Sequence, residues 1–264
     1  VSPYNHWFFI SSNGSLSAGR KNSNNSLFPY YTDDKITELQ DVTGNKTIIK
    51  ILYSDKLSLW EPFSIRNYGL YDIERNLYKN FEGNKVIFEE INNSLGLVYK
   101  YQWSSCDEFG FVKKSTLTNN NDKSVKIELL DGIQNILPWG VDESLQNSTS
   151  NLVDAYKRNE LEKFSKIGIY ALSALIVDKA EPSEALKANI AWSTGFDKSK
   201  ILLSSLQLDN FRKNFNISQE EDIKAEKGAY YVNSDFELSS NQKKTWHIAC
   251  DVNKSSSEII KLKN

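Results

Sequence analysis

The stretch ELLDGIQNILPWGVD, residues 128–142, lies where the character of the sequence changes. Just before and into it, residues 125–130 alternate apolar and charged side chains, which is the pattern of a strand with one buried face. The dipeptide Asp-Gly at 131–132 is a turn signal, and Pro138 and Gly140 interrupt regular structure. The stretch therefore predicts a turn followed by an apolar loop, which is either buried against a second layer or lines a site.

Short runs of β-branched and aromatic residues recur along the rest of the chain, separated by turn residues, and no β-α-β rhythm or internal repeat is visible. This spacing predicts a mainly β fold, a large antiparallel two-sheet sandwich with one or two helices inserted or at the C-terminal end. The predicted strands cover residues 7–10, 16–20, 27–31, 47–53, 58–63, 68–76, 85–91, 97–103, 109–115, 125–130, 167–177, 184–193, 201–208, 229–232, 235–238 and 245–252.

Two segments predict helices. Residues 151–164 carry an apolar face behind Thr149 or Ser150 as the cap. Ser255 and Glu258 have the spacing of a capping box that begins a second helix. We therefore expect residues 1–252 to form the sandwich and residues 253–264 to begin a helical linker into a further domain. The chain of 264 residues has no methionine, which also leads us to expect an internal fragment of a longer protein.

The composition excludes several classes of function. A net charge of −2 without a basic stripe argues against nucleic-acid binding, and no apolar run predicts a membrane span or a signal peptide. Cys106 and Cys250 are too few for a disulfide framework, so a reduced compartment is expected, the cytoplasm with the periplasm as the alternative. His6 and His247 lack the spacing of metal ligands, and no phosphate or dinucleotide loop is present, so no cofactor is expected.

The candidate contact residues are aromatic rings and the charged groups beside them. Trp139 directly follows Pro138, and Trp60 lies two residues before Pro62; a flat indole can either pack between sheets or offer its face to a sugar ring. Core packing is the favoured interpretation for Trp60, and the two interpretations are balanced for Trp139. Glu61 could bind sugar hydroxyls beside Trp60, and Arg20 ends a Gly/Ser turn. No residue is assigned as catalytic, since a carboxylate pair cannot be placed across a cleft by sequence.

Several segments resemble cellobiose phosphorylase-like proteins. They are an aromatic strand leading into a Gly/Ser turn that ends in Arg at residues 7–20, the segments 30–35 and 131–138, the Trp-x-Pro element at 59–63, and two further stretches at 151–156 and 177–185. The resemblance implies an N-terminal super-sandwich of the galactose mutarotase-like architecture. It further implies a helical linker, an (α/α)6 barrel that carries the catalytic acid and the phosphate site, an oligosaccharide substrate, and a sandwich that braces the barrel and supports dimerisation.

Nothing in this chain matches the barrel, so no catalytic residue is carried over. On this resemblance, residues 131–141 are expected to be the crossing between the two halves of the sandwich, with Ile136 and Leu137 in the core. The candidate residues Trp139, Trp60, Glu61 and Arg20 could contact either a carbohydrate or the barrel, and loops of the sandwich could reach the sugar site. The main hypothesis is therefore a non-catalytic domain of a glycoside phosphorylase or glycosidase, with inorganic phosphate entering only if the parent is a phosphorylase. A stand-alone carbohydrate-binding module is the second hypothesis. A self-sufficient mutarotase-like epimerase or hydrolase is the third, and it would need histidines or two carboxylates converging in one pocket.

Overall fold

The computed structural model describes residues 4–31, 35–53, 56–66, 68–148, 150–174 and 186–262. Its strands are β1 His6–Ile10, β2 Leu16–Arg20, β3 Gly44–Tyr53, β4 Lys56–Trp60, β5 Ile73–Lys79, β6 Val86–Asn92, β7 Leu97–Cys106, β8 Gly110–Asn119, β9 Val125–Ile136, β10 Lys157–Leu161, β11 Gly168–Leu172, β12 Lys187–Thr194, β13 Lys200–Leu202, β14 Asp222–Lys224, β15 Gly228–Leu238 and β16 Lys243–Ser255. The helices are α1 Lys35–Glu38, α2 Glu143–Ser148, α3 Ser150–Tyr156, α4 Leu208–Arg212 and α5 Ser256–Leu262, with a 3-10 turn at Ser23–Asn25.

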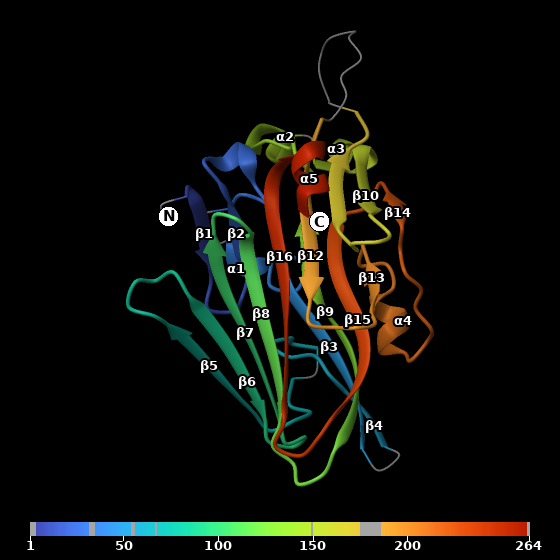
Figure 1. Cartoon of the computed structure of the whole chain (residues 1–264). Coiled ribbons are helices and arrows are strands. Elements are labelled where there is room, and N and C mark those ends of the chain that lie inside the picture. The colour runs from blue at the N-terminus through green and yellow to red at the C-terminus, as the bar shows by residue number, and fades with distance from the viewer. Residues whose placement is uncertain are drawn as a thin grey trace.

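The strands form two large antiparallel sheets that face each other (Figure 1). One sheet has nine strands in the order β14-β10-β11-β12-β16-β8-β7-β6-β5, and the other has five in the order β13-β15-β9-β3-β4. A separate hairpin, β1-β2, completes the described strands. The sequence-based prediction of a mainly β, antiparallel two-sheet sandwich is confirmed, whereas the described residues form five short helices where one or two were predicted.

The prediction for the opening stretch is wrong in its first part. The dipeptide 131–132 is not a turn, because β9 continues through it to Ile136 and pairs with β15 on one side and β3 on the other. Gly132 is needed there for space, since a Cβ atom would lie 2.3 Å from the Tyr230 carbonyl oxygen. The segment is therefore a central strand of the five-stranded sheet rather than a crossing between the halves. Ile136 and Leu137 are buried, as expected.

The helix predicted over 151–164 is also too long. Helix α3 ends at Tyr156, and β10 follows at once in the nine-stranded sheet. The inward positions of β10 include Lys157 and Asn159, and these polar residues hid its alternation from a hydrophobicity pattern. The Asn159 amide donates to the Leu203 carbonyl at 3.4 Å, which satisfies part of this buried group.

Smaller differences concern the second half of the chain. The predicted strand 201–208 stops at Leu202 and leads to α4, while residues 229–232 and 235–238 belong to one strand, β15. Strand β16 continues three residues past the expected domain boundary at 252. Thr149 and the whole 177–185 segment used for the resemblance lie outside the described residues, as do residues 32–34.

The C-terminal helix begins as predicted. The backbone N–H and the hydroxyl of Ser255 both donate to Glu258 Oε2, at 2.9 and 2.7 Å, so the glutamate half of the capping box is formed. Helix α5 then packs Ile259 against the buried Ile190 of β12. Within the described residues, none of the helices has the length and apolar content to cross a bilayer.

A polar network lies in the core between the two sheets. Asp131 of β9 and Lys113 of β8 are fully buried, and the ammonium donates to Asp131 Oδ1 at 2.7 Å. The same carboxylate accepts hydrogen bonds from four neutral donors: Thr47 Oγ1 (2.6 Å), Tyr99 OH (2.9 Å), Ser115 Oγ (3.1 Å) and Trp246 Nε1 (2.6 Å). Both carboxylate oxygens are thus satisfied without water, which joins β9 to three strands of the opposite sheet.

Candidate functional site: a groove across the five-stranded sheet

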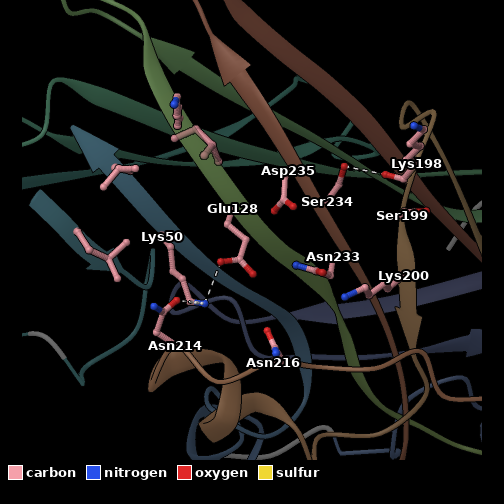
Figure 2. A pocket seen from close by; sticks show the side chains of 14 residues that line it. Lys50, Glu128, Lys198, Ser199, Lys200, Asn214, Asn216, Asn233, Ser234 and Asp235 are labelled. Carbon is pink, nitrogen blue, oxygen red and sulfur yellow. Dashed lines mark hydrogen bonds and ion pairs between the residues drawn. The ribbon is translucent and has the colours of Figure 1, made fainter. Parts of the chain in front are cut away.

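An open groove of about 870 Å³ lies on the outer face of the five-stranded sheet. Each strand of that sheet contributes to its lining, together with the turn before β13 and the segment after α4. We call it the sheet groove. Figure 2 shows Lys50 and Asn214 on one side, Lys198 and Lys200 on the other, and Glu128 and Asp235 between them.

Strand alternation explains why charged residues gather on this face. In β3 and β9, Ile49, Ile51, Ile127 and Leu129 point into the core, so the intervening side chains point outward. Strand register then aligns Lys50 of β3 with Glu128 of β9, and Glu128 with Asp235 of β15. The floor of the groove therefore carries a lysine and two carboxylates in one row across three strands.

Lys50 holds one side of this row in place. Its ammonium donates to Glu128 Oε2 at 2.9 Å and to Asn214 Oδ1 at 3.0 Å, and it lies 4.1 Å from the centre of the Phe211 ring. Only 3% of Lys50 is exposed, so these contacts replace most of its hydration. Because the Asn214 side-chain oxygen accepts the hydrogen bond from Lys50, its amide nitrogen can donate hydrogen bonds to other groups.

Asp235 is the less stabilised carboxylate of the two. Partial burial raises its pKa above the ordinary value, the neighbouring Glu128 carboxylate raises it further, and Lys200 and Lys50 act in the opposite direction. Glu128 has Lys50 as a direct partner, whereas Asp235 forms no ion pair within the described residues. Its negative charge is therefore the one that the groove tolerates least.

The far wall carries two lysines that are exposed. Lys200 Nζ donates to the Ile217 carbonyl at 3.1 Å, and Lys198 takes part through its carbonyl oxygen, which accepts from the Ser234 hydroxyl at 2.9 Å. Neither ammonium forms an ion pair with a described residue. Both are thus available for a ligand with negative charge or hydroxyl groups.

One end of the groove is apolar. Leu52 of β3 and Leu57 of β4 are directly opposite each other in the strand register and are 38% and 48% exposed. The groove lining described here contains no aromatic ring, so this aliphatic pair is its main apolar surface. Such a surface can contact the C–H face of a sugar while nearby amides and charges bind its hydroxyls.

The predicted site residues lie elsewhere. Trp60 is buried, and its Nε1 donates to Glu90 Oε1 at 2.7 Å, so the favoured interpretation of core packing is the one observed. The ring has no open face for a sugar, and the contact interpretation of Trp60 is corrected accordingly. Glu61 is 3% exposed and forms a bidentate ion pair with Arg212 of α4. Arg212 Nε donates to Glu61 Oε1 at 2.6 Å, and Nη2 donates to Oε2 at 3.1 Å. This pair anchors α4 to the sheet instead of presenting a carboxylate to a ligand.

Arg20 and Trp139 are each occupied by contacts within the chain. Arg20 bonds the exposed Asp107 at 2.9 Å and the buried Asp251 at 3.2 Å, which joins the β1-β2 hairpin to the nine-stranded sheet. It lines a separate hollow of about 390 Å³ near α5. Trp139 is half-buried, and Lys187 Nζ lies 5.7 Å from the centre of its ring. The structure brings none of the four predicted residues into the sheet groove.

The histidines occupy different elements. His6 of β1 packs edge-on against Phe111, with 5.0 Å between ring centres, and His247 of β16 lies opposite Thr194. Burial lowers the pKa of both, so both are held toward the neutral form. Cys106 and Cys250 are free thiols. Among the described residues, no three His, Cys, Asp or Glu side chains gather as metal ligands.

The groove residues carried a signal that the sequence interpretation used only in part. The alternation over 125–130 indicated that Lys126 and Glu128 face outward, but not which strands would flank them. Asp235, which pairs with Glu128, belongs to strand β15 and lies more than 100 residues away in the sequence. Pairing over this distance is a property of topology, so the groove could not be assembled from local patterns.

The whole fold also occurs as one part of larger carbohydrate-active enzymes. The chain aligns over 98% of its length with a polysaccharide lyase (TM-score 0.54, 10% identity) and covers 34% of that chain. It aligns over 97% of its length with a bacterial glucoamylase solved in complex with acarbose (TM-score 0.56, 10% identity) and covers 31% of that chain. The chain thus spans about a third of each. No protein-family model matches the sequence, and comparison with curated proteins gives no match.

Proposed function

We propose that this chain is a non-catalytic β-sandwich domain of a carbohydrate-active enzyme. The observation that carries the proposal is its near-complete alignment with only a third of a lyase and of a glucoamylase. At about 10% identity this likeness concerns the fold, so the activity of the parent enzyme is part of the proposal. The segments that resemble cellobiose phosphorylase-like proteins favour a glycoside phosphorylase or glycosidase with an (α/α)6 barrel beyond α5. Inorganic phosphate would act only in such a phosphorylase.

The groups present in the sheet groove are consistent with a supporting role. Glu128 is neutralised by Lys50, and Asp235 is exposed in an open groove, without the enclosure that raises the reactivity of an acid–base pair. The two histidines are on different strands. A domain of this kind would brace a catalytic barrel through its surfaces and leave the chemistry to it.

The proposal is tested by assaying the purified protein for turnover. The substrates are β-linked disaccharides with and without inorganic phosphate, and a uronate polysaccharide for eliminative cleavage. We expect no product above a blank without protein. Turnover that is lost in the double variant Glu128→Gln/Asp235→Asn, but kept in Glu82→Gln at a distant turn, would overturn the non-catalytic assignment.

A second candidate function is carbohydrate binding by the sheet groove, and a specific observation favours it. The groove combines an exposed aliphatic pair, Leu52 and Leu57, with amide and charged groups along one continuous surface. These are the components of a sugar site. Titration calorimetry with cello-, malto- and uronate oligosaccharides tests this role, and absence of heat with every member of the panel would argue against it.

A further inference from the structure

The charge of the sheet groove is opposite to that of the chain. Four lysines and two carboxylates line it, whereas the chain as a whole has a net charge of −2. The charge of one of these lysines, Lys50, is neutralised by its ion pair with Glu128. The remaining lysines face a single carboxylate, Asp235, so the groove offers positive charge that the protein itself does not neutralise.

The available ammonium groups are spread along the groove instead of being clustered at one point. Lys126 of β9 lies at the apolar end of the groove, because it is directly opposite Leu52 of β3, which is in turn opposite Leu57 of β4. Lys198 and Lys200 lie on the far wall, formed by β13 and the turn before it (Figure 2). A ligand that satisfies both groups must therefore carry charges at more than one place along its length.

The groove is long enough for such a ligand. It crosses all five strands of the sheet, and five strands at a spacing of about 4.8 Å span roughly 19 Å. Along this path the amides of Asn214 and Asn216 supply donors and acceptors for hydroxyl groups. The exposed Leu52–Leu57 pair supplies a patch for the apolar face of a ring.

We infer that the sheet groove binds an acidic oligosaccharide, one that carries carboxylate or sulfate groups on successive sugars. The inference rests on the proposed carbohydrate-binding role of the groove and goes further by naming the class of sugar. Lys198, Lys200 and Lys126 bind the acidic groups, the asparagine amides bind hydroxyls, and the leucine pair contacts a ring face. Asp235 opposes binding, because its charge repels the same groups that the lysines attract.

Three variants separate these contributions. In Lys198→Gln/Lys200→Gln the stems stay and the charges are lost, and we expect affinity to fall by about tenfold for each charged hydrogen bond removed. In Asp235→Asn we expect binding to become several-fold tighter, since one repulsive charge is lost. The matched control is Lys79→Gln/Lys85→Gln, which removes two exposed lysines at the β5-β6 hairpin of the other sheet and leaves binding unchanged.

The measurement is titration calorimetry on the intact chain with four probes: an oligogalacturonate, a heparin-derived oligosaccharide, a neutral cello-oligosaccharide and a poly-glutamate peptide. We expect the two acidic oligosaccharides to bind, more weakly as salt is raised, and the other two not to. Equal binding of the neutral sugar, with no loss in the lysine variant, would overturn the acidic preference while the binding role stands. Equal binding of poly-glutamate would refute recognition of a sugar. Absence of binding to every probe would refute the binding role as well.

Discussion

The buried pair between Lys113 and Asp131 allows a quantitative prediction about stability. Both side chains are fully buried between the two sheets, 2.7 Å apart at the closest atoms. Replacing Lys113 by Met leaves a carboxylate in the core with four neutral donors and no counterion. Replacing Asp131 by Asn leaves the ammonium without a counterion and turns an amide nitrogen toward donors that need an acceptor.

Each single substitution should cost about 3–5 kcal/mol, because an unpaired buried charge loses both its partner and its hydration. A domain of ordinary stability has about 5–15 kcal/mol in total, so the loss is large enough to shift unfolding strongly. Burial lowers the pKa of Lys113, so part of the penalty in Asp131→Asn can be relieved by loss of its proton. The double variant Lys113→Met/Asp131→Asn removes both charges, and we expect its cost to be at least about 2 kcal/mol below the sum of the two.

Urea unfolding followed by tryptophan fluorescence gives the free energies, with the slope checked for each variant. Lys114→Met is the matched control, since this neighbour on β8 is exposed, and it should change stability by less than about 0.5 kcal/mol. Single-variant costs below about 1 kcal/mol would contradict the account of a charge pair held in the core. Additive costs in the double variant would contradict the coupling between the two side chains.

Three further predictions concern other parts of the sandwich. Gly132→Ala should cost about 1–3 kcal/mol or more in urea unfolding, since its Cβ meets the Tyr230 carbonyl, and unchanged stability would mean that the strands can separate locally. Glu258→Ala should cost about 1 kcal/mol, since it removes the acceptor of both Ser255 hydrogen bonds at the start of α5, and unchanged urea midpoints would mean that the capping box adds no stability. In the folded protein the pKa values of His6 and His247 lie below the 6.5 of the unfolded chain. The unfolded chain therefore takes up protons at a higher pH than the folded protein does, so the free energy of unfolding should fall as pH is lowered from 7 toward 5. Urea midpoints across that range test this, and a midpoint that rises on acidification would have the wrong sign.

The sequence predicted the fold class because most strands carry their own alternation. Residues 97–103 and 245–252 show it plainly, and both form strands, β7 and β16, that extend beyond the predicted ends. The failures occur where tertiary contacts outweigh local preference. Asp131-Gly132 has the composition of a turn, yet the buried lysine and the close approach of β15 hold it in the middle of β9.

The site was predicted less well for the same physical reason. Tryptophans within two residues of a proline were chosen as candidates, but Trp60 satisfies its indole N–H with the buried Glu90 and belongs to the core. The groove instead consists of lysines, asparagines and carboxylates that look like ordinary surface residues one at a time. Only the strand order places them together, and the order involves strands distant in sequence.

The position of β16 has a consequence for how the chain is made. In the nine-stranded sheet this strand lies between β12 and β8, and it is the last of the described strands along the chain. During translation the β5–β8 meander and the strands β10–β12 leave the ribosome as two separate pieces, each with an open edge. The edges of β8 and β12 remain unpaired until residues 243–255 have left the ribosome and formed β16. Until then, each edge could pair with a strand of another chain. We therefore expect the nine-stranded sheet to be completed late in folding, and chaperones to bind ribosome-bound chains that end before residue 243 more than longer ones.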